Sequence, residues 1–112
     1  MKTNELTGAA LDWAVAKCEG RTWLDAENFL AYWEEDGEMK YSTDWAQGGP
    51  IIEREKINLR HDPDCNKAQA WEASDDIDFF EAVYGPTPLI AAMRCYTVSK
   101  LGDTVEIPKG LT

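Results

Sequence analysis

The sequence is poor in the residues on which most metal sites depend. Its 112 residues include one histidine, His61, and three cysteines whose spacing matches neither a CxxC motif nor a disulfide framework. A zinc site needs three or four ligands at set spacings, whereas His61 is accompanied only by Asp62, Asp64 and Cys65 in a segment typical of a turn. We therefore expect no bound metal, no cofactor and reduced thiols.

Signatures of nucleophilic catalysis are also missing. Ser42, Ser74 and Ser99 lack a GxSxG context, and only His61 is available as their base. Cys65 lies near His61 in sequence, but neighbours in a turn rarely reach the geometry of a nucleophile and its base. Nothing selects a catalytic pair among the 21 acidic residues. We expect a protein that is not an enzyme, with a hydrolase as the residual alternative.

Basic residues and long apolar runs are scarce as well. Lys and Arg total 11 against 21 Asp and Glu, which gives a formal net charge of -10. Such an excess repels phosphate backbones and anionic membranes, so we expect no direct contact with nucleic acid or with a membrane. No stretch approaches the roughly 20 apolar residues that cross a bilayer, and the N-terminus has no apolar signal core. These features predict a protein that stays in the cytoplasm where it is made.

The composition that remains is that of a globular domain, with 44% hydrophobic and 29% charged residues. A chain of this length forms a single domain over residues 1–112, because two separate cores would each be too small to be stable. One helix is predicted near each end of this domain. The first covers about residues 4–19, where apolar residues recur at the spacing of one helix face. The second runs from Thr87, its N-cap, to Leu101, and Gly102 closes it.

Short strands are predicted between and after the two helices. Residues 57–60 and 68–73 are rich in strand-forming residues and flank a turn cluster, and residues 104–107 suggest a final short strand. The sum is an α+β domain, in which a small, mostly antiparallel sheet is covered on one face by an N-terminal and a C-terminal helix.

Residues 22–42 admit two interpretations. An aromatic run followed by an Asp-Gly pair at positions 36 and 37 favours a β-hairpin, because Asp-Gly is a specific turn signal. The alternative is a helix over residues 25–35, which would place Phe29 and Trp33 one turn apart. We favour the hairpin.

Residues 42–50 form a polar, glycine-rich segment around Trp45, and a short helix is predicted to begin at Pro50. Most of the five tryptophans are expected in the core, but Trp23, Trp33 and Trp45 lie in the less regular region and are candidates for a pocket or an interface. The segment is interpreted either as a tight turn with a buried tryptophan or as a ligand-binding site. Both interpretations stay open.

As a binding site, the segment offers suitable chemistry for a nucleotide. A tryptophan stacks on a base, a neighbouring carboxylate and amide bind the base edge, and a glycine pair donates backbone N–H groups. Arginines further along the chain meet phosphate, although Arg94 is first expected in an ordinary salt bridge. The predicted ligand-binding residues are Thr43, Asp44, Trp45, Gln47, Gly48, Gly49, Arg54 and Arg94.

Acidic residues are dense in residues 34–38 and 72–81. Small acidic proteins can imitate a phosphate backbone and occupy a nucleic-acid-binding protein, and Asp75, Asp76 and Asp78 are the residues to test for this activity. The simpler interpretation is a solvated surface. We favour that interpretation here, because apolar residues interrupt the acidic ones.

Three blocks of sequence, residues 6–20, 41–55 and 85–96, cover well over a third of the chain. Their sequences are LTGAALDWAVAKCEG, YSTDWAQGGPIIERE and GPTPLIAAMRCY, and in content and order they resemble the NinX-like family of tailed-phage and prophage proteins. Residues 21–40 and 72–81 depart from that pattern. The family is one of unknown function, so the resemblance implies a small accessory protein made inside an infected bacterium.

These observations together predict a phage accessory protein that binds a small nucleotide-like ligand without converting it, and thereby sequesters a signal such as one used in host immunity. The alternative is an acidic inhibitor that binds a host protein by imitating nucleic acid. Either activity is compatible with assembly into a homo-oligomer.

Overall fold

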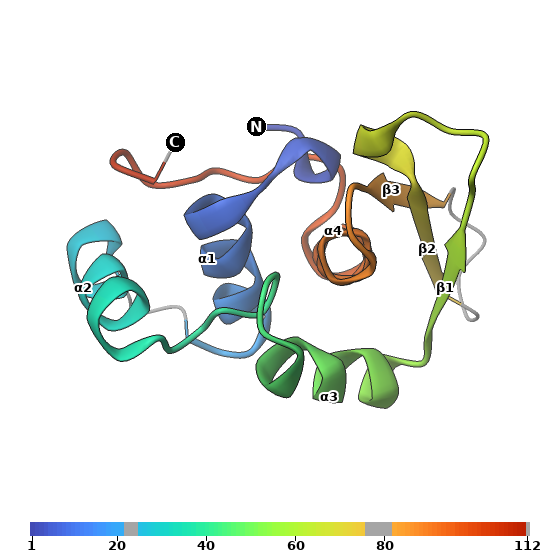
Figure 1. Ribbon diagram of the computed structural model, residues 1–112. Coiled ribbons are helices and arrows are strands. Elements are labelled where there is room, and N and C mark those ends of the chain that lie inside the picture. The colour runs from blue at the N-terminus through green and yellow to red at the C-terminus, as the bar shows by residue number, and fades with distance from the viewer. Residues whose placement is uncertain (22–24, 76–81, 112) are drawn as a thin grey trace.

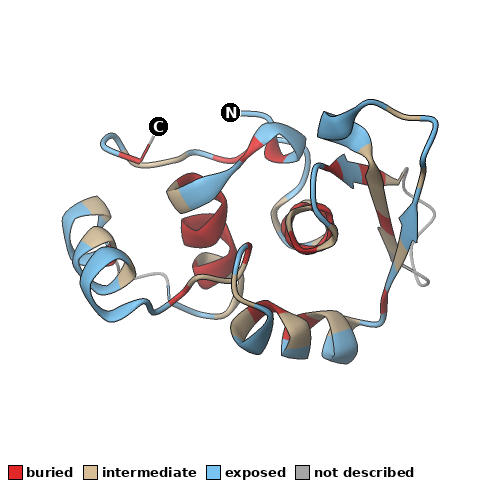
Figure 2. Cartoon of the chain, in the orientation of Figure 1, coloured by how far each residue is buried: buried red, intermediate tan, exposed pale blue. Residues whose placement is uncertain are grey.

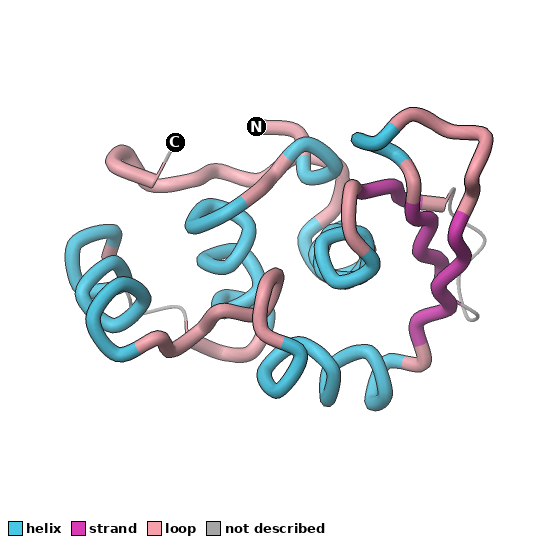
Figure 3. The backbone as a smooth tube through the Cα atoms, in the orientation of Figure 1, coloured by secondary structure: helices cyan, strands magenta, loops and turns pink. Residues whose placement is uncertain are grey.

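A long helix, α4 (Pro88–Leu101), lies between a three-stranded sheet and the other helices (Figure 1). This arrangement is seen in a computed structural model, which describes residues 1–21, 25–75 and 82–111. The helices α1 (Gly8–Cys18) and α3 (Trp45–Glu55) pack against other sides of α4. Figure 3 shows that the strands gather at one end of a mainly helical chain. The predicted α+β class is confirmed.

The central position of α4 follows from its composition and its ends. The Thr87 hydroxyl oxygen accepts a hydrogen bond from the Ile90 N–H at 3.1 Å, and Pro88 occupies the first helical position, as the sequence predicts. Gly102 follows the last turn with a positive φ of 87°. Small and apolar residues surround most of the helix, so it is buried on nearly every side (Figure 2).

Helix α1 packs against α4, and the predicted first helix is confirmed in its main part. Leu11, Ala14 and Val15 are fully buried in this contact. The helix begins at Gly8, later than predicted, because Gly8 has a positive φ of 56° and separates α1 from the short 3-10 turn η1 (Thr3–Glu5). The terminal helices therefore stack in order, with α4 on the sheet and α1 on α4.

The sheet contains β1 (Ile57–His61), β2 (Trp71–Asp75) and β3 (Val83–Gly85) in the antiparallel order β1-β2-β3. Helix α4 packs against all three strands. The first predicted strand is confirmed, and the second begins later than predicted because the short turn η3 (Lys67–Gln69) precedes it. Strand β3 was not predicted from the sequence, since three residues carry too little pattern.

The first residues of the chain lie beside the segment that follows α4. The Thr3 hydroxyl donates a hydrogen bond to the Gly102 carbonyl at 2.7 Å, and one isolated β-bridge joins Lys2 to Thr104. The strand predicted over residues 104–107 is reduced to this bridge.

The hairpin predicted for residues 22–42 is wrong, and the helical alternative is correct. Helix α2 (Ala26–Ala31) continues directly into the π-helix η2 (Tyr32–Asp36). The rings of Phe29 and Trp33 stack one turn apart, with centroids 6.5 Å from each other. Gly37 adopts a left-handed φ of 66° and ends the helix, so the Asp-Gly pair is a helix terminus here.

The short helix predicted to begin at Pro50 is also corrected. Helix α3 begins at Trp45, because the Asp44 carboxylate caps it by accepting the Ala46 N–H at 2.9 Å. Pro50 lies inside α3 and is exposed. Because proline has no backbone N–H, the helix lacks one internal hydrogen bond there but does not end.

Candidate functional site

The segment predicted to bind a ligand forms the start of α3. Trp45 is the first residue of the helix and 54% of its surface is exposed, so it is not the buried anchor of a tight turn. Thr43 is also exposed, in the turn before the helix. The structure therefore leaves an aromatic face available to a partner at this end of α3.

The polar groups of Asp44 and Gln47 are directed at the chain itself. One Asp44 oxygen accepts the Ala46 N–H, and the other accepts the Gln47 side-chain amide at 2.9 Å. The Gln47 amide also donates to the Gly37 carbonyl at 2.8 Å, and its oxygen accepts the Lys40 N–H at 2.9 Å. These bonds fix the start of α3 against the end of η2.

Gly48 and Gly49 lie within the helix, on different faces. The Gly48 N–H donates to the Asp44 carbonyl at 2.9 Å as part of the helical ladder. A Cβ atom on Gly48 would overlap the Tyr41 carbonyl oxygen and would lie 2.7 Å from Leu89 Cδ1. The same atom on Gly49 would meet only Trp45, at 3.8 Å. Gly48 therefore permits the close approach of α3 to α4.

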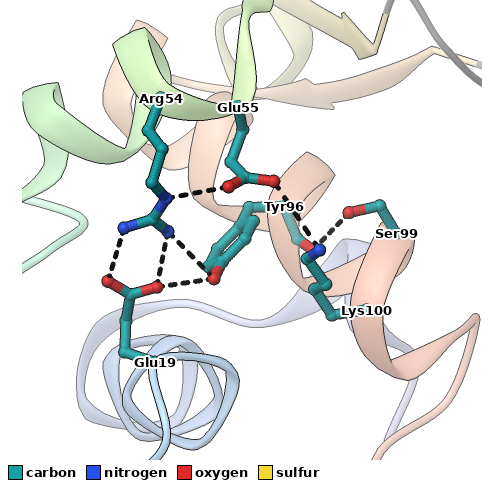
Figure 4. Close-up of polar contacts among 6 residues, drawn as sticks. All are labelled: Glu19, Arg54, Glu55, Tyr96, Ser99 and Lys100. Atoms are coloured by element: carbon teal, nitrogen blue, oxygen red, sulfur yellow. Dashed lines mark hydrogen bonds and ion pairs between the residues drawn. The ribbon is translucent and has the colours of Figure 1, made fainter.

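Arg54 belongs to a charged network that joins the C-terminal ends of α1, α3 and α4 (Figure 4). Its guanidinium donates to both Glu19 oxygens at 3.1 and 2.7 Å, to Glu55 at 2.8 Å and to the Tyr96 hydroxyl at 3.1 Å. The Tyr96 hydroxyl in turn donates to Glu19 at 2.5 Å, and Lys100 lies 3.7 Å from Glu55. This network ties the three helices together.

The pKa values within this network follow from its contacts. Burial raises the pKa of Tyr96, and the hydrogen bond to Glu19 raises it further, so the phenol keeps its proton. Burial alone would raise the pKa of Glu19, but the hydrogen bonds from Arg54 and Tyr96 outweigh it and lower that pKa overall. Arg54 thus has its charge matched by Glu19 and Glu55.

Arg94 lies on α4 and only 8% of its surface is exposed. Its guanidinium donates to the carbonyl oxygens of Leu6 and Tyr84, each at 2.8 Å. Burial lowers the pKa of Arg94. These contacts join η1 and β3 to α4 through backbone carbonyls.

The predicted ligand residues are therefore brought together only in part. Thr43 to Gly49 form one continuous stretch at the start of α3. Arg54 follows Trp45 by nine residues, which is about 13 Å along a helix axis, and Arg94 is buried on another helix. Within residues 1–21, 25–75 and 82–111, no three His, Cys, Asp or Glu side chains gather as metal ligands would.

A buried carboxylate outside the predicted ligand-binding residues holds the segment before α3 in place. Asp12, on α1, is fully buried and accepts hydrogen bonds from Trp33 Nε1 and from the Ser42 N–H, both at 2.8 Å. Lys40 lies with its Nζ atom 3.7 Å from the centroid of the Trp33 ring. Burial raises the pKa of Asp12, while the bonds from Trp33 and Ser42 and the charge of Lys40 oppose that shift.

The bond from Trp33 to Asp12, which we call the Asp12 anchor, positions a surface of exposed acidic side chains. We call residues 34–38 the acidic segment: Glu34, Glu35, Asp36, Gly37 and Glu38 are all exposed. Tyr32, one residue before the anchored Trp33, has 40% of its surface exposed. The acidic segment is thus attached at one end through Trp33 to Asp12 and near its other end through Gly37 to Gln47.

An Asp within an apolar helix stripe was the available signal for this anchor, since such a residue needs a buried partner. The other sequence candidates are not placed. Trp23, Asp76 and Asp78 lie outside the described residues, as does the side chain of Asp75.

A comparison with protein families identifies the group to which the sequence belongs. The family model described as Bacteriophage P22, NinX matches residues 2–100. The chain is a member of this NinX family. The match includes α1, the acidic segment and α3, and the family resemblance expected from the three sequence blocks is confirmed. A search of curated proteins finds no match. Among the described residues of this NinX-family chain, no helix has the length and apolar character needed to cross a membrane.

Proposed function

We propose that this NinX-family phage protein acts in the cytoplasm of the infected bacterium as a non-catalytic inhibitor that binds a basic surface of a host protein. The single observation that carries the proposal is the acidic segment, residues 34–38, with its four exposed carboxylates. The chain as a whole carries a net charge of -10. Complementary charge accelerates encounter with a basic partner and disfavours acidic competitors.

The attachment of the acidic segment favours binding over a purely solvating role. Trp33 is bonded to the buried Asp12, and the Gly37 carbonyl accepts a hydrogen bond from Gln47. A segment that is already ordered loses less conformational entropy on binding than a free acidic tail does. The same attachment places Tyr32 at the surface, and tyrosine is among the residues that contribute most to protein interfaces.

The partner that fits this surface is a host protein with clustered Lys and Arg, as nucleic-acid-binding proteins have. Carboxylates at the helix end can occupy the positions that phosphates would take on such a surface. The binding is then expected to weaken as salt is added, because exposed charges are screened over about 10 Å at 0.1 M ionic strength.

Reversal of the acidic segment should abolish this binding. A variant with Glu34, Glu35 and Asp36 all changed to Lys is expected to lose at least about tenfold in affinity for a protein captured from host lysate, since three charge contacts become repulsive. The affinity is measured by titration of the identified partner with wild type and variant at two salt concentrations.

The matched control changes Glu53, Asp64 and Glu106 to Lys. These residues are exposed and lie outside the acidic segment, so the net charge changes by the same amount. Equal loss of affinity in the two variants would show that only total charge matters and would contradict the proposal, as would the absence of any captured partner.

A second candidate function rests on the exposure of Trp45. A tryptophan with 54% of its surface in contact with water is uncommon, and this one stands at the start of a helix. Stacking of a nucleotide base on such a ring contributes roughly 1–3 kcal/mol. The remaining recognition would have to come from groups other than Asp44 and Gln47 in their present bonds.

Thermal unfolding against linear, cyclic and ribose-modified nucleotides tests this candidate. A ligand at about 100 times its dissociation constant adds roughly 2.7 kcal/mol, which raises the unfolding midpoint of a domain of this size by roughly 10 °C. Trp45→Ala is expected to lower the affinity at least about tenfold. Tyr32→Ala, which removes another exposed aromatic ring, is the control. Absence of a shift with every nucleotide would contradict this candidate.

A further inference from the structure

The outer edge of β1 carries backbone groups that point away from the rest of the sheet. The Asp62 N–H donates to the Ala70 carbonyl at 2.8 Å, which fixes the alternation of hydrogen bonds between β1 and β2. Because hydrogen-bonded and non-hydrogen-bonded residues alternate along β1, the backbone N–H and C=O groups of Asn58 and Arg60 point at β2. The N–H and C=O groups of Ile57, Leu59 and His61 point away from the sheet.

The opposite edge of the sheet, formed by β3, is covered by a side chain. The same alternation turns the N–H and C=O of Tyr84 away from β2. The Tyr84 carbonyl accepts a hydrogen bond from Arg94 at 2.8 Å. A buried arginine therefore occupies the outward acceptor of a strand only three residues long.

Strand β1 is longer and lacks such a cover in the described part of the chain. It has five residues, contains no proline, and pairs with β2 alone among the strands of residues 1–21, 25–75 and 82–111. An unpaired edge of this kind is a template for another strand. Figure 1 shows β1 at the side of the sheet away from α1.

We propose that β1 pairs in antiparallel orientation with β1 of a second copy of this chain, so that two three-stranded sheets become one continuous sheet. The two strands are related by a two-fold axis perpendicular to the sheet. Both copies of α4 then lie on the same face of that sheet.

Charges within β1 and directly before and after it select one register for this pairing. With the axis at Leu59, the outward groups of both strands bond to each other. Lys56, the left-handed residue before β1, is then placed across from Asp62, the residue after β1, of the other copy. With the axis at Asn58, Lys56 faces Arg60, and with the axis at Arg60 two arginines face each other. Like charges directly opposite are destabilising, so the register centred on Leu59 is favoured.

Amide hydrogen exchange tests the pairing at the backbone. The Leu59 N–H is expected to exchange rapidly in dilute protein and at least about tenfold more slowly in concentrated protein, where light scattering gives twice 12.6 kDa. The control is the Arg60 N–H, which is directed at β2 and is protected at both concentrations. A mass that stays at 12.6 kDa up to several hundred micromolar, or a dimer with an unprotected Leu59 N–H, would overturn the proposal.

A reciprocal exchange of charge tests the register. Lys56→Glu and Asp62→Lys each turn two attractions into two repulsions, so each alone is expected to raise the dimer dissociation constant at least about tenfold. When the two variants are mixed, the new glutamate of one copy would face the new lysine of the other. Both facing pairs are then of opposite charge again, and dimerisation should return.

The control for this experiment is a charge change in the same turn as Asp62. Asp62 also accepts hydrogen bonds from the Asp64 N–H and from Cys65, so Asp64→Lys, which changes charge in the same turn, is the control and should dimerise as wild type does. Lys56→Glu leaves that turn intact and tests the register by itself. Unchanged dimerisation in Lys56→Glu, or no recovery in the mixture, would overturn the register.

Discussion

Replacing Gly48 with alanine is expected to destabilise the fold by about 3 kcal/mol, whereas the same change at Gly49 should stabilise it. The Cβ atom at position 48 would overlap the Tyr41 carbonyl oxygen and press on Leu89, and forced overpacking of a core typically costs about 1–3 kcal/mol or more. At position 49 the nearest atom is 3.8 Å away, so the gain in helix propensity of about 0.5–1 kcal/mol remains.

The two adjacent substitutions share their chemistry and differ in what the methyl group meets, so each is the control of the other. Urea unfolding of both variants beside wild type measures the difference. The midpoint of thermal unfolding should fall by roughly 10 °C or more for Gly48→Ala. Equal effects at the two positions would contradict the close approach of α3 to α4.

Replacing Asp12 with alanine is expected to cost about 3 kcal/mol. The change leaves the buried Ser42 N–H and the half-buried Trp33 Nε1 without their acceptor, and an unsatisfied buried donor costs about 1–3 kcal/mol. Asp12→Asn keeps the shape and one acceptor oxygen, so it should lose less. Indole fluorescence and urea unfolding report the release of Trp33 and the loss of stability.

The pH dependence of Asp12 has a definite sign. Its pKa is raised in the folded protein, so between the ordinary aspartate pKa and the raised value the folded chain holds more protons than the unfolded chain. Stability from this group therefore falls as pH rises through that window. Relative to Asp12→Asn, wild type should lose stability between about pH 4 and the raised pKa, and a difference with the opposite slope would contradict the burial of this charge.

Elements of the fold were predicted most accurately where the signal lay within a single turn of the chain. Thr87 and Pro88 mark the start of α4 by chemistry confined to one turn, and both were found. The Asp-Gly signal at positions 36 and 37 was misinterpreted, because it reports only a positive φ at Gly37 and that angle serves a helix terminus as well as a hairpin. Pro50 was misinterpreted for a related reason, since one lost hydrogen bond does not end a helix capped by Asp44.

The candidate site depended on contacts between distant residues, which the sequence pattern does not contain. Gly48 was predicted to donate to a ligand, but the structure shows it against Leu89, and that contact is set by how α3 crosses α4. The bond from Trp33 to Asp12 spans 21 positions in sequence and gives the acidic segment its place. Charge density alone located the acidic residues without showing what holds them.

The contact of the N-terminal residues with α4 and with Gly102 bears on the order in which the protein is made and folds. The Leu6 carbonyl is bonded to Arg94, and Thr3 to Gly102, across 88 and 99 positions of sequence. Thr3 and Leu6 therefore form these contacts only after Arg94 and Gly102 have been synthesised. Folds dominated by such distant contacts form more slowly than their helix content suggests. Until α4 has been synthesised, the face of α1 that packs against it is exposed, and a chaperone can bind it.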